Sequence, residues 1–184
     1  MCWCRSSSRR CWASPMPEPG LTPGVLRPNV CAVLTNTARA RVLVFRRVDS
    51  VLGEHRWQFP QGGMKPDEAP DDALRRELRE EIGTDAVEVL ARLPKPIAYH
   101  YPPDVLESLR RRDPAKARYV GQAQHWYLAR LVGDTAQLHF NHQPPEFDAF
   151  EWVPPSEAVS RVVPFKREAY RQALAAFGLL ADEP

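Results

Sequence analysis

The sequence predicts an α+β protein in which a mixed β-sheet has helices on both of its sides. Two observations favour this class. Short runs rich in β-branched and aromatic residues recur from residue 30 onward, and polar turns separate them. Two amphipathic segments, 70–82 and 164–178, show the apolar spacing of helices. No apolar run approaches the roughly 20 residues that a membrane-spanning helix needs.

The first extended segments lead up to a pair of glycines. VCAVLTN (30–36) and RVLVFRR (41–47) are joined by a polar turn, and WQFPQGG (57–63) is a brief extended segment that breaks at the glycines. Further strands are expected at 86–93, 97–101, 123–132, 137–140 and 148–153. We expect residues 102–122 to form one long connection between strands.

Both expected helices carry recognisable end signals. Pro70 begins the first helix, two aspartates occupy its first turn, and Gly83 lies just past its end. The second helix stops at Gly178. Its inner face is expected to consist of Ala169, Ala173, Leu174 and Phe177.

A chain of 184 residues favours one domain, and a net charge of +2 gives no general argument for a nucleic-acid binder. We expect a disordered leader and proline-rich linker at 1–23, one domain at 24–178 and a short tail at 179–184. The leader has no apolar core of a secretory signal, and its three cysteines fit no structural zinc spacing. This composition favours the reducing cytoplasm.

The segment RRELREEIG (75–83) separates three kinds of side chain around one helix. At about 100° per residue, Glu77, Glu80 and Glu81 share one sector, apart from an apolar stripe and from the arginines. Three carboxylates so placed repel one another unless a cation joins them, and oxygen ligands suit Mg²⁺ or Mn²⁺. The spacing alone leaves open whether this sector is a metal site or a solvated acidic surface.

A wider pattern surrounds this segment. Gly62, then Glu68, then the run from Arg76 to Gly83 resembles the box of the Nudix hydrolases almost position for position, with one departure at Thr84. The resemblance implies an α/β/α sandwich with a catalytic loop–helix–loop. It also implies two or more Mg²⁺ or Mn²⁺ ions on the box glutamates, and a structural pairing of Glu68 with Arg76. The family hydrolyses a nucleoside diphosphate linked to another group.

The flanks of the box resemble bacterial RNA 5′-pyrophosphohydrolases and, through them, plant-type dinucleoside polyphosphate hydrolases. The likeness covers about residues 26–177 and rests on RPNV (27–30), 46–63, GQAQHWYL (121–128), PPEFDAFEWV (144–153) and VVPFKREAY (162–170). It implies removal of pyrophosphate from triphosphorylated RNA 5′ ends. Hydrolysis of dinucleoside polyphosphates is the alternative, and a nucleotide-binding module that does not cleave is disfavoured because the box keeps every acid.

The same likeness supplies candidate site residues. Glu146 is expected to join Glu77, Glu80 and Glu81 as a metal ligand and catalytic residue. Substrate contacts are expected from Arg27, Arg47, Gln58, Gln61, Gly62, Gly63, Tyr99, Phe165 and Lys166. Six of these residues have an ordinary alternative: an exposed loop acid for Glu146, surface arginines for Arg27 and Arg47, a strand tyrosine for Tyr99, a core ring for Phe165 and a solvated lysine for Lys166. The basic cluster of Arg110, Arg111, Arg112, Lys116 and Arg118 fits either a polyanionic substrate or a solvated loop.

Overall fold

The computed structural model describes residues 24–48, 55–140 and 144–180. The expected leader at 1–23 lies outside the described residues, as do residues 181–184 of the expected tail. None of the helices in the described ranges is long and apolar enough to cross a membrane.

The strands of the described chain form one sheet, in the order β3-β2-β1-β7-β5, with β4, β6 and β8 attached beside β1, β7 and β2. Its strands are β1 (Val25–Thr35), β2 (Val42–Arg47), β3 (Trp57–Gln58), β4 (Gln61–Gly63), β5 (Val87–Arg92), β6 (Ile97–His100), β7 (Tyr119–Leu131) and β8 (Phe147–Val153). The central strands β1 and β7 are parallel, and the other pairs are antiparallel. The predicted mixed sheet is therefore confirmed.

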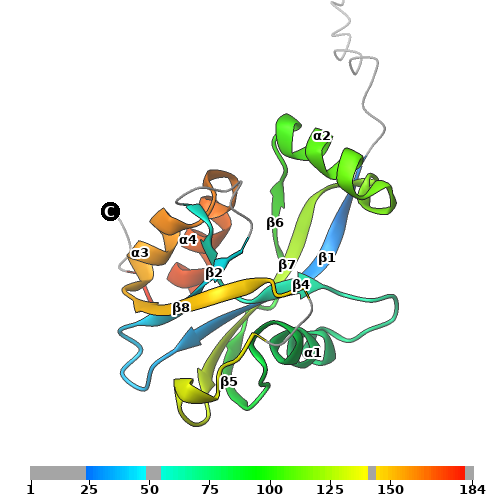
Figure 1. The fold of residues 1–184 in the computed structure, drawn as a ribbon. Coiled ribbons are helices and arrows are strands. Elements are labelled where there is room, and N and C mark those ends of the chain that lie inside the picture. The colour runs from blue at the N-terminus through cyan, green and yellow to red at the C-terminus, as the bar shows by residue number, and fades with distance from the viewer. Residues whose placement is uncertain (1–23, 49–54, 141–143, 181–184) are drawn as a thin grey trace, which may run out of the picture.

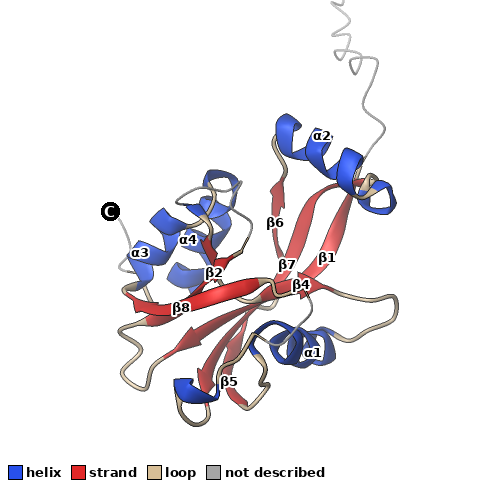
Figure 2. Cartoon of the chain, in the orientation of Figure 1, coloured by secondary structure: helices blue, strands red, loops and turns tan. Residues whose placement is uncertain are grey.

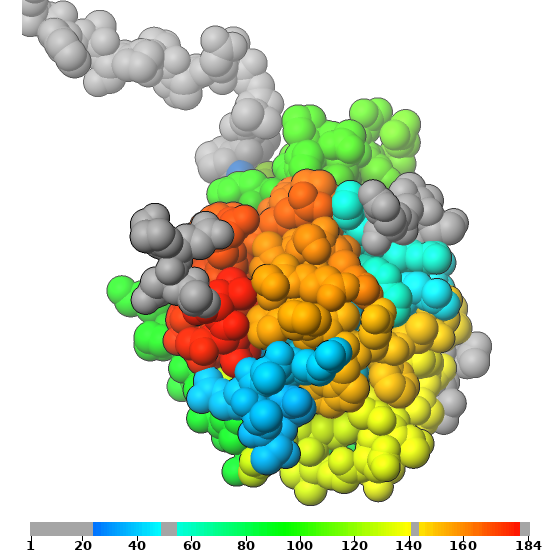
Figure 3. All heavy atoms as spheres, turned by 90° about the vertical axis from the view of Figure 1, so that its left-hand side faces the viewer, coloured from blue at the N-terminus to red at the C-terminus, as the bar shows by residue number. Residues whose placement is uncertain are grey.

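Helices cover both faces of this sheet (Figure 1, Figure 2). Helix α1 (Pro70–Ile82) packs on one face, and α3 (Pro155–Arg161) with α4 (Arg167–Ala176) packs on the other. Figure 3 shows the second layer from outside, where residues of α3 and α4 fill the centre of the face in orange and red. The predicted α+β arrangement with helices on both sides is confirmed.

Strand β1 is buried on both faces, which explains its continuous apolar run. Cys31 and Val33 belong to the core under α3 and α4, whereas Val30, Ala32 and Leu34 belong to the core over α1. Alternate side chains of a strand point to opposite faces, so one strand serves both cores. The central strands therefore form a fixed platform between two packed layers.

Two predicted segments have a different structure. Residues 137–140 are not a strand, because Asp134 accepts a hydrogen bond from the Ala136 N–H and caps a 3₁₀ turn at Thr135–Gln137. The expected long connection at 102–122 contains a helix, α2 (Pro103–Arg112), a 3₁₀ turn η2 (Pro114–Lys116) and the start of β7. Proline at the first helical position and Asp104 in the first turn favour α2, but its apolar stripe is short.

The C-terminal region also differs in detail from the expectation. The predicted helix at 164–178 begins with a 3₁₀ turn at Pro164–Lys166, and α4 ends at Ala176. Gly178 adopts positive φ just beyond it, so the predicted stop is confirmed. Its predicted inner face is buried: Ala169, Ala173, Leu174 and Phe177. Helix α3 was absent from the sequence prediction.

Candidate active site

Helix α1 is anchored by its apolar stripe. Leu74, Leu78 and Ile82 are buried against the sheet, and Gly83 ends the helix in the left-handed conformation with φ 78°. Thr84 accepts a hydrogen bond from the Ala86 N–H at 3.1 Å, so this departure from the box stabilises the turn after the helix. The anchored stripe directs the side of α1 that carries Glu77 and Glu81 toward β4.

Gly62 and Gly63 allow two charged side chains to lie directly on the backbone of β4. A Cβ atom at Gly62 would stand 1.8 Å from the Glu77 carboxyl carbon. A Cβ atom at Gly63 would stand 1.9 Å from the Arg27 guanidinium. Glycine at both positions therefore leaves room for the ends of these two side chains, and it places a carboxylate and a cation against neighbouring residues.

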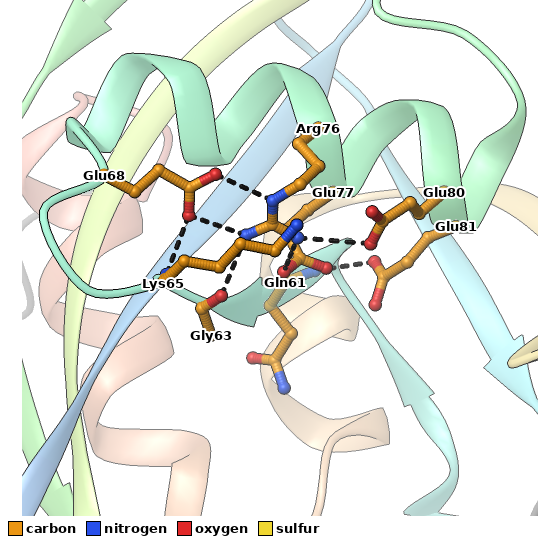
Figure 4. A network of polar contacts seen from close by, with 8 residues as sticks. All are labelled: Gln61, Gly63, Lys65, Glu68, Arg76, Glu77, Glu80 and Glu81. Carbon is orange, nitrogen blue, oxygen red and sulfur yellow. Dashed lines mark hydrogen bonds and ion pairs between the residues drawn. The ribbon is translucent and has the colours of Figure 1, made fainter.

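Arg76 connects the loop before α1 to the carboxylates of the helix (Figure 4). Its Nε and Nη2 donate to Glu68 at 2.7 and 2.8 Å, and Nη2 also donates to the Gly63 carbonyl at 2.9 Å. Nη1 donates to Glu77 at 2.6 Å and to Glu80 at 3.1 Å. The expected pairing of Glu68 with Arg76 is present, and the guanidinium lowers the pKa of Glu68 to about 2.

Glu81 is a nearly buried carboxylate in an acidic neighbourhood. Its side chain accepts the Gln61 backbone N–H at 2.9 Å, and the residue is only 5% exposed. Burial raises its pKa well above the ordinary value, and the charges of Glu146 and Glu77 raise it further. Burial also raises the pKa of Glu77. Burial and neighbouring carboxylates therefore both disfavour the charged form of Glu81.

Arginines hold several of these carboxylates. Arg76 bonds Glu77 and Glu80, and Arg47 forms an ion pair with Glu146. As the side chains stand, the described residues contain no group of three acidic, histidine or cysteine side chains arranged around a single metal position. The oxygen donors nevertheless suit a hard divalent cation, which would compete with the arginines for the same carboxylates.

A cavity of about 480 Å³ brings most of the predicted site residues together. Those lining it are Arg27, Arg47, Gln58, Gln61, Gly62, Gly63, Glu77, Glu81, Tyr99, Glu146, Phe165 and Lys166. Glu80 does not line the cavity, and its side chain is 42% exposed. Glu68 and Arg76 do not line the cavity, and Arg76 bonds both Glu68 and the carbonyl of Gly63, which does.

Lys166 is a buried ammonium group at the cavity. It is 8% exposed, donates to Gln58 Oε1 at 3.2 Å and lies 5.9 Å from the centre of the Tyr99 ring. Burial and the nearby Arg47 lower the pKa of Lys166 to about 8. A solvated surface lysine is thereby excluded.

Three aromatic rings form a second part of the lining. Phe165 is half-buried, with its centre 5.8 Å from that of Tyr99 and 6.0 Å from that of Tyr101. The Tyr99 hydroxyl donates to Gln122 at 2.7 Å. Tyr99 therefore contributes its ring as well as a fixed hydroxyl, and Phe165 keeps part of its surface open to the cavity.

Sequence reasoning missed the buried amides beneath the cavity. Gln124 Nε2 donates to Asn29 at 2.9 Å and to Gln61 at 2.8 Å, so it links β1, β7 and β4. Asn29 and Gln122 line the cavity themselves. The signal was two glutamines two positions apart in GQAQHW, which must lie on one face of a strand.

Comparisons with known proteins identify the family. The family model described as NUDIX domain matches residues 25–173. An RNA pyrophosphohydrolase of Erythrobacter litoralis is 41% identical over 157 residues, covering 83% of this chain and 92% of the relative. Another, from Helicobacter pylori, is 39% identical over 154 residues, covering 82% and 92%.

Solved structures agree in fold alone. The dihydroneopterin triphosphate pyrophosphohydrolase of E. coli superposes with a TM-score of 0.58 at 18% identity, covering 83% of this chain and 99% of that one. A C. elegans Ap4A hydrolase complex gives a TM-score of 0.57 at 16% identity, covering 83% and 97%. The family model and the relatives together show that this chain belongs to the Nudix hydrolase superfamily.

Proposed function

We propose that this protein removes pyrophosphate from triphosphorylated RNA 5′ ends and leaves a 5′-monophosphate. One observation carries the proposal. A single cavity is lined by carboxylates on α1 and beside β8, by cations from five other elements, and by a half-buried ring. Relatives of about 40% identity over more than four fifths of this chain bear the name RNA pyrophosphohydrolase, which supports this substrate.

The cations and amides are suited to the polyphosphate. Arg27, Arg47 and Lys166 line the same cavity as Gln58 and Gln61, so positive charges and amide donors face one space. A triphosphate presents several charged oxygens, which bind best to charged donors placed before the substrate arrives. This group therefore orients the phosphate chain and carries no information about the base.

The aromatic part of the lining is suited to an unpaired base. RNA-binding proteins commonly recognise single-stranded ends by stacking their bases on aromatic side chains. Phe165 has the open surface for such a contact, and Tyr99 and Tyr101 hold it in place. We assign the base of the second nucleotide of the RNA to Phe165, a base that ATP does not have.

Divalent metal ions, Mg²⁺ or Mn²⁺, would be held by Glu77, Glu80, Glu81 and Glu146. Bound there, they would polarise phosphoryl oxygens and lower the pKa of the attacking water. The chain's own contribution is to fix the carboxylates. The Gln61 N–H orients Glu81, and Arg76 holds Glu77 against Gly62 until a cation competes for it.

We expect a second kind of RNA 5′ end to be a substrate as well. Diphosphorylated RNA should also be accepted, with release of phosphate, because the same cavity would hold the shorter chain. We also propose the cytoplasm as the compartment in which the protein meets such RNA ends.

The decisive experiment compares substrates at equal concentration with Mg²⁺ and again with Mn²⁺. Triphosphorylated RNA, diadenosine tetraphosphate and ATP are each assayed for kcat/KM. We expect RNA to exceed both nucleotides by at least about tenfold, or about 1.4 kcal/mol of transition-state stabilisation. A higher kcat/KM on diadenosine tetraphosphate would replace RNA with dinucleoside polyphosphates as the main substrate.

A further inference from the structure

Helix α2 stands apart from both cores. None of its residues is buried, and none belongs to either hydrophobic cluster. Figure 1 shows it beyond the end of β6, far from α1 and beside the N-terminal end of β1. Among the described elements its main partner is η2, the short turn that follows it. Packing of the fold therefore does not explain why this helix is present.

One side of α2 and η2 faces the active-site cavity. The lining residues from this segment are Val105, Leu109, Arg112 and Lys116, and Tyr119 at the start of β7 lines the cavity beside them. The first three follow the spacing of one helix face, four and then three residues apart. Arg110 and Arg111 lie between them in the sequence and do not line the cavity. The segment thus divides its basic residues between two sides.

The cavity-facing side combines apolar and cationic groups. Val105 and Leu109 are half-buried, whereas Arg112 and Lys116 are exposed. Lys116 forms an ion pair with Asp113 at 2.7 Å, and the two side chains are 47% and 36% exposed. Pairs so exposed contribute little to stability, so a phosphate can compete for the lysine.

This wall lies well away from the carboxylates. Strand β1 pairs with β4 at Val30 and Gly62, beside Glu77, and with β7 at Val25 and Tyr119, beside α2. Five residues of strand separate these pairings, or about 16 Å. Successive nucleotides of a stacked strand rise by about 3.4 Å, so the cavity extends beyond a single nucleotide.

We propose that α2 and η2 bind the RNA chain downstream of its first two nucleotides. Arg112 and Lys116 contact phosphodiester groups there, and Val105 and Leu109 pack against the sugars or bases. The inference rests on the proposed function, and it names the segment that prefers a polynucleotide over a free nucleotide. Charge complementarity and continuity with the cavity identify the occupant as RNA.

The test uses two double variants of the full-length protein. Arg112→Ala/Lys116→Ala removes the two cations that line the cavity. Arg110→Ala/Arg111→Ala removes the same charge from neighbouring positions and serves as the matched control. Each is assayed for kcat/KM on triphosphorylated RNAs of two and eight nucleotides and on ATP, at several salt concentrations, and each melting temperature is measured.

We expect the first variant to lose about tenfold on the eight-nucleotide RNA, less on the dinucleotide and nothing on ATP. The slope of log kcat/KM against log salt should become shallower by about 1.4 for the long RNA, for two lost phosphate contacts. The control should keep wild-type kinetics.

Three results would overturn the assignment of α2. They are equal losses in both double variants, an equal loss on ATP and long RNA, and no loss at all. Failure of the proposed function would look different, because the unmodified protein would then prefer a nucleotide to every RNA. A melting temperature that falls in the first variant alone would mean that the two cations stabilise the fold.

Discussion

Helices α1 and α2 resemble each other in sequence but not in their surroundings. Both are amphipathic, both begin with proline at the first helical position, and both carry arginines. Five residues of α1 are buried, including Glu81, whereas none of α2 is. The difference fits our proposals that α1, anchored in the core, positions the metal-binding carboxylates and that α2 contacts the remote part of the RNA.

The cause lies in what each apolar stripe meets. The stripe of α1 lies on the sheet, where Leu78 is 1% exposed. Val105 and Leu109 of α2 line the active-site cavity and keep part of their surface open. Burial supplies most helical stability in proteins, so α2 depends more on its ends and its ion pairs. The comparison can be tested through stability, catalysis and substrate length.

Matched leucine truncations should give the largest contrast. Leu78→Ala should lower the free energy of unfolding by about 2–5 kcal/mol, because it opens a cavity in a packed core. Leu109→Ala should lower it by less than about 1 kcal/mol, because the side chain is already half-exposed. Urea denaturation measures both. Similar losses would show that α2 is as firmly packed as α1.

Removing one carboxylate of α1 should give the next largest effect. Glu81→Gln should lower kcat by at least about a hundredfold, or about 2.7 kcal/mol, while the protein stays folded. The variant keeps the shape of the side chain and its contact with the Gln61 N–H. Glu107→Gln on α2, whose carboxylate pairs with Arg111 at 3.4 Å, is the control and should retain wild-type turnover. Near-normal turnover of Glu81→Gln would mean that Glu81 is not a metal ligand.

The same contrast explains what the sequence could reveal. The apolar stripe of α1 and the central strands were predicted correctly, because burial enforces their sequence patterns. The box was recognised instead by its resemblance to the Nudix hydrolases. Helix α2 was expected as part of an irregular connection, because a half-exposed helix needs few apolar residues. The Gln124 network was missed, because its partners Asn29 and Gln61 come from distant strands. Such contacts depend on strand register, which a single chain does not display.

The ion pair between Glu68 and Arg76 should make the free energy of unfolding depend on pH. The pKa of Glu68 is lowered to about 2, so its ion pair with Arg76 stabilises the fold fully above the unfolded value of 4.5. That contribution is lost as the pH falls from about 4.5 toward 2. Glu68→Gln should cost about 1.5–3 kcal/mol at pH 7 and progressively less below pH 4.5. Denaturation of both proteins across this range gives the difference, and a constant difference would contradict the ion pair as its cause.

The last comparison is between the effects of substituting Phe165, Lys166 and the residues of α2 on different substrates. Lys166→Ala should weaken every polyphosphate substrate by a similar factor and make the salt dependence shallower, because a charge carries no information about the base. Phe165→Ala should remove a stacking contact worth about 1–3 kcal/mol, or about five- to a hundredfold. The loss should fall on RNA and spare ATP.

The length of the RNA then distinguishes the contribution of Phe165 from that of α2. The effect of Phe165→Ala should be complete with a triphosphorylated dinucleotide, because the ring lies among Tyr99 and Tyr101 in the inner lining. The effect of altering α2 should keep growing as the RNA lengthens. Measuring kcat/KM on ATP and on RNAs of two to eight nucleotides gives both profiles. Equal losses on ATP and RNA from Phe165→Ala would mean that the ring only supports the core. If the loss of kcat/KM in Phe165→Ala grew with RNA length in the same way as the loss in the α2 variant, the two segments would contact the same nucleotides.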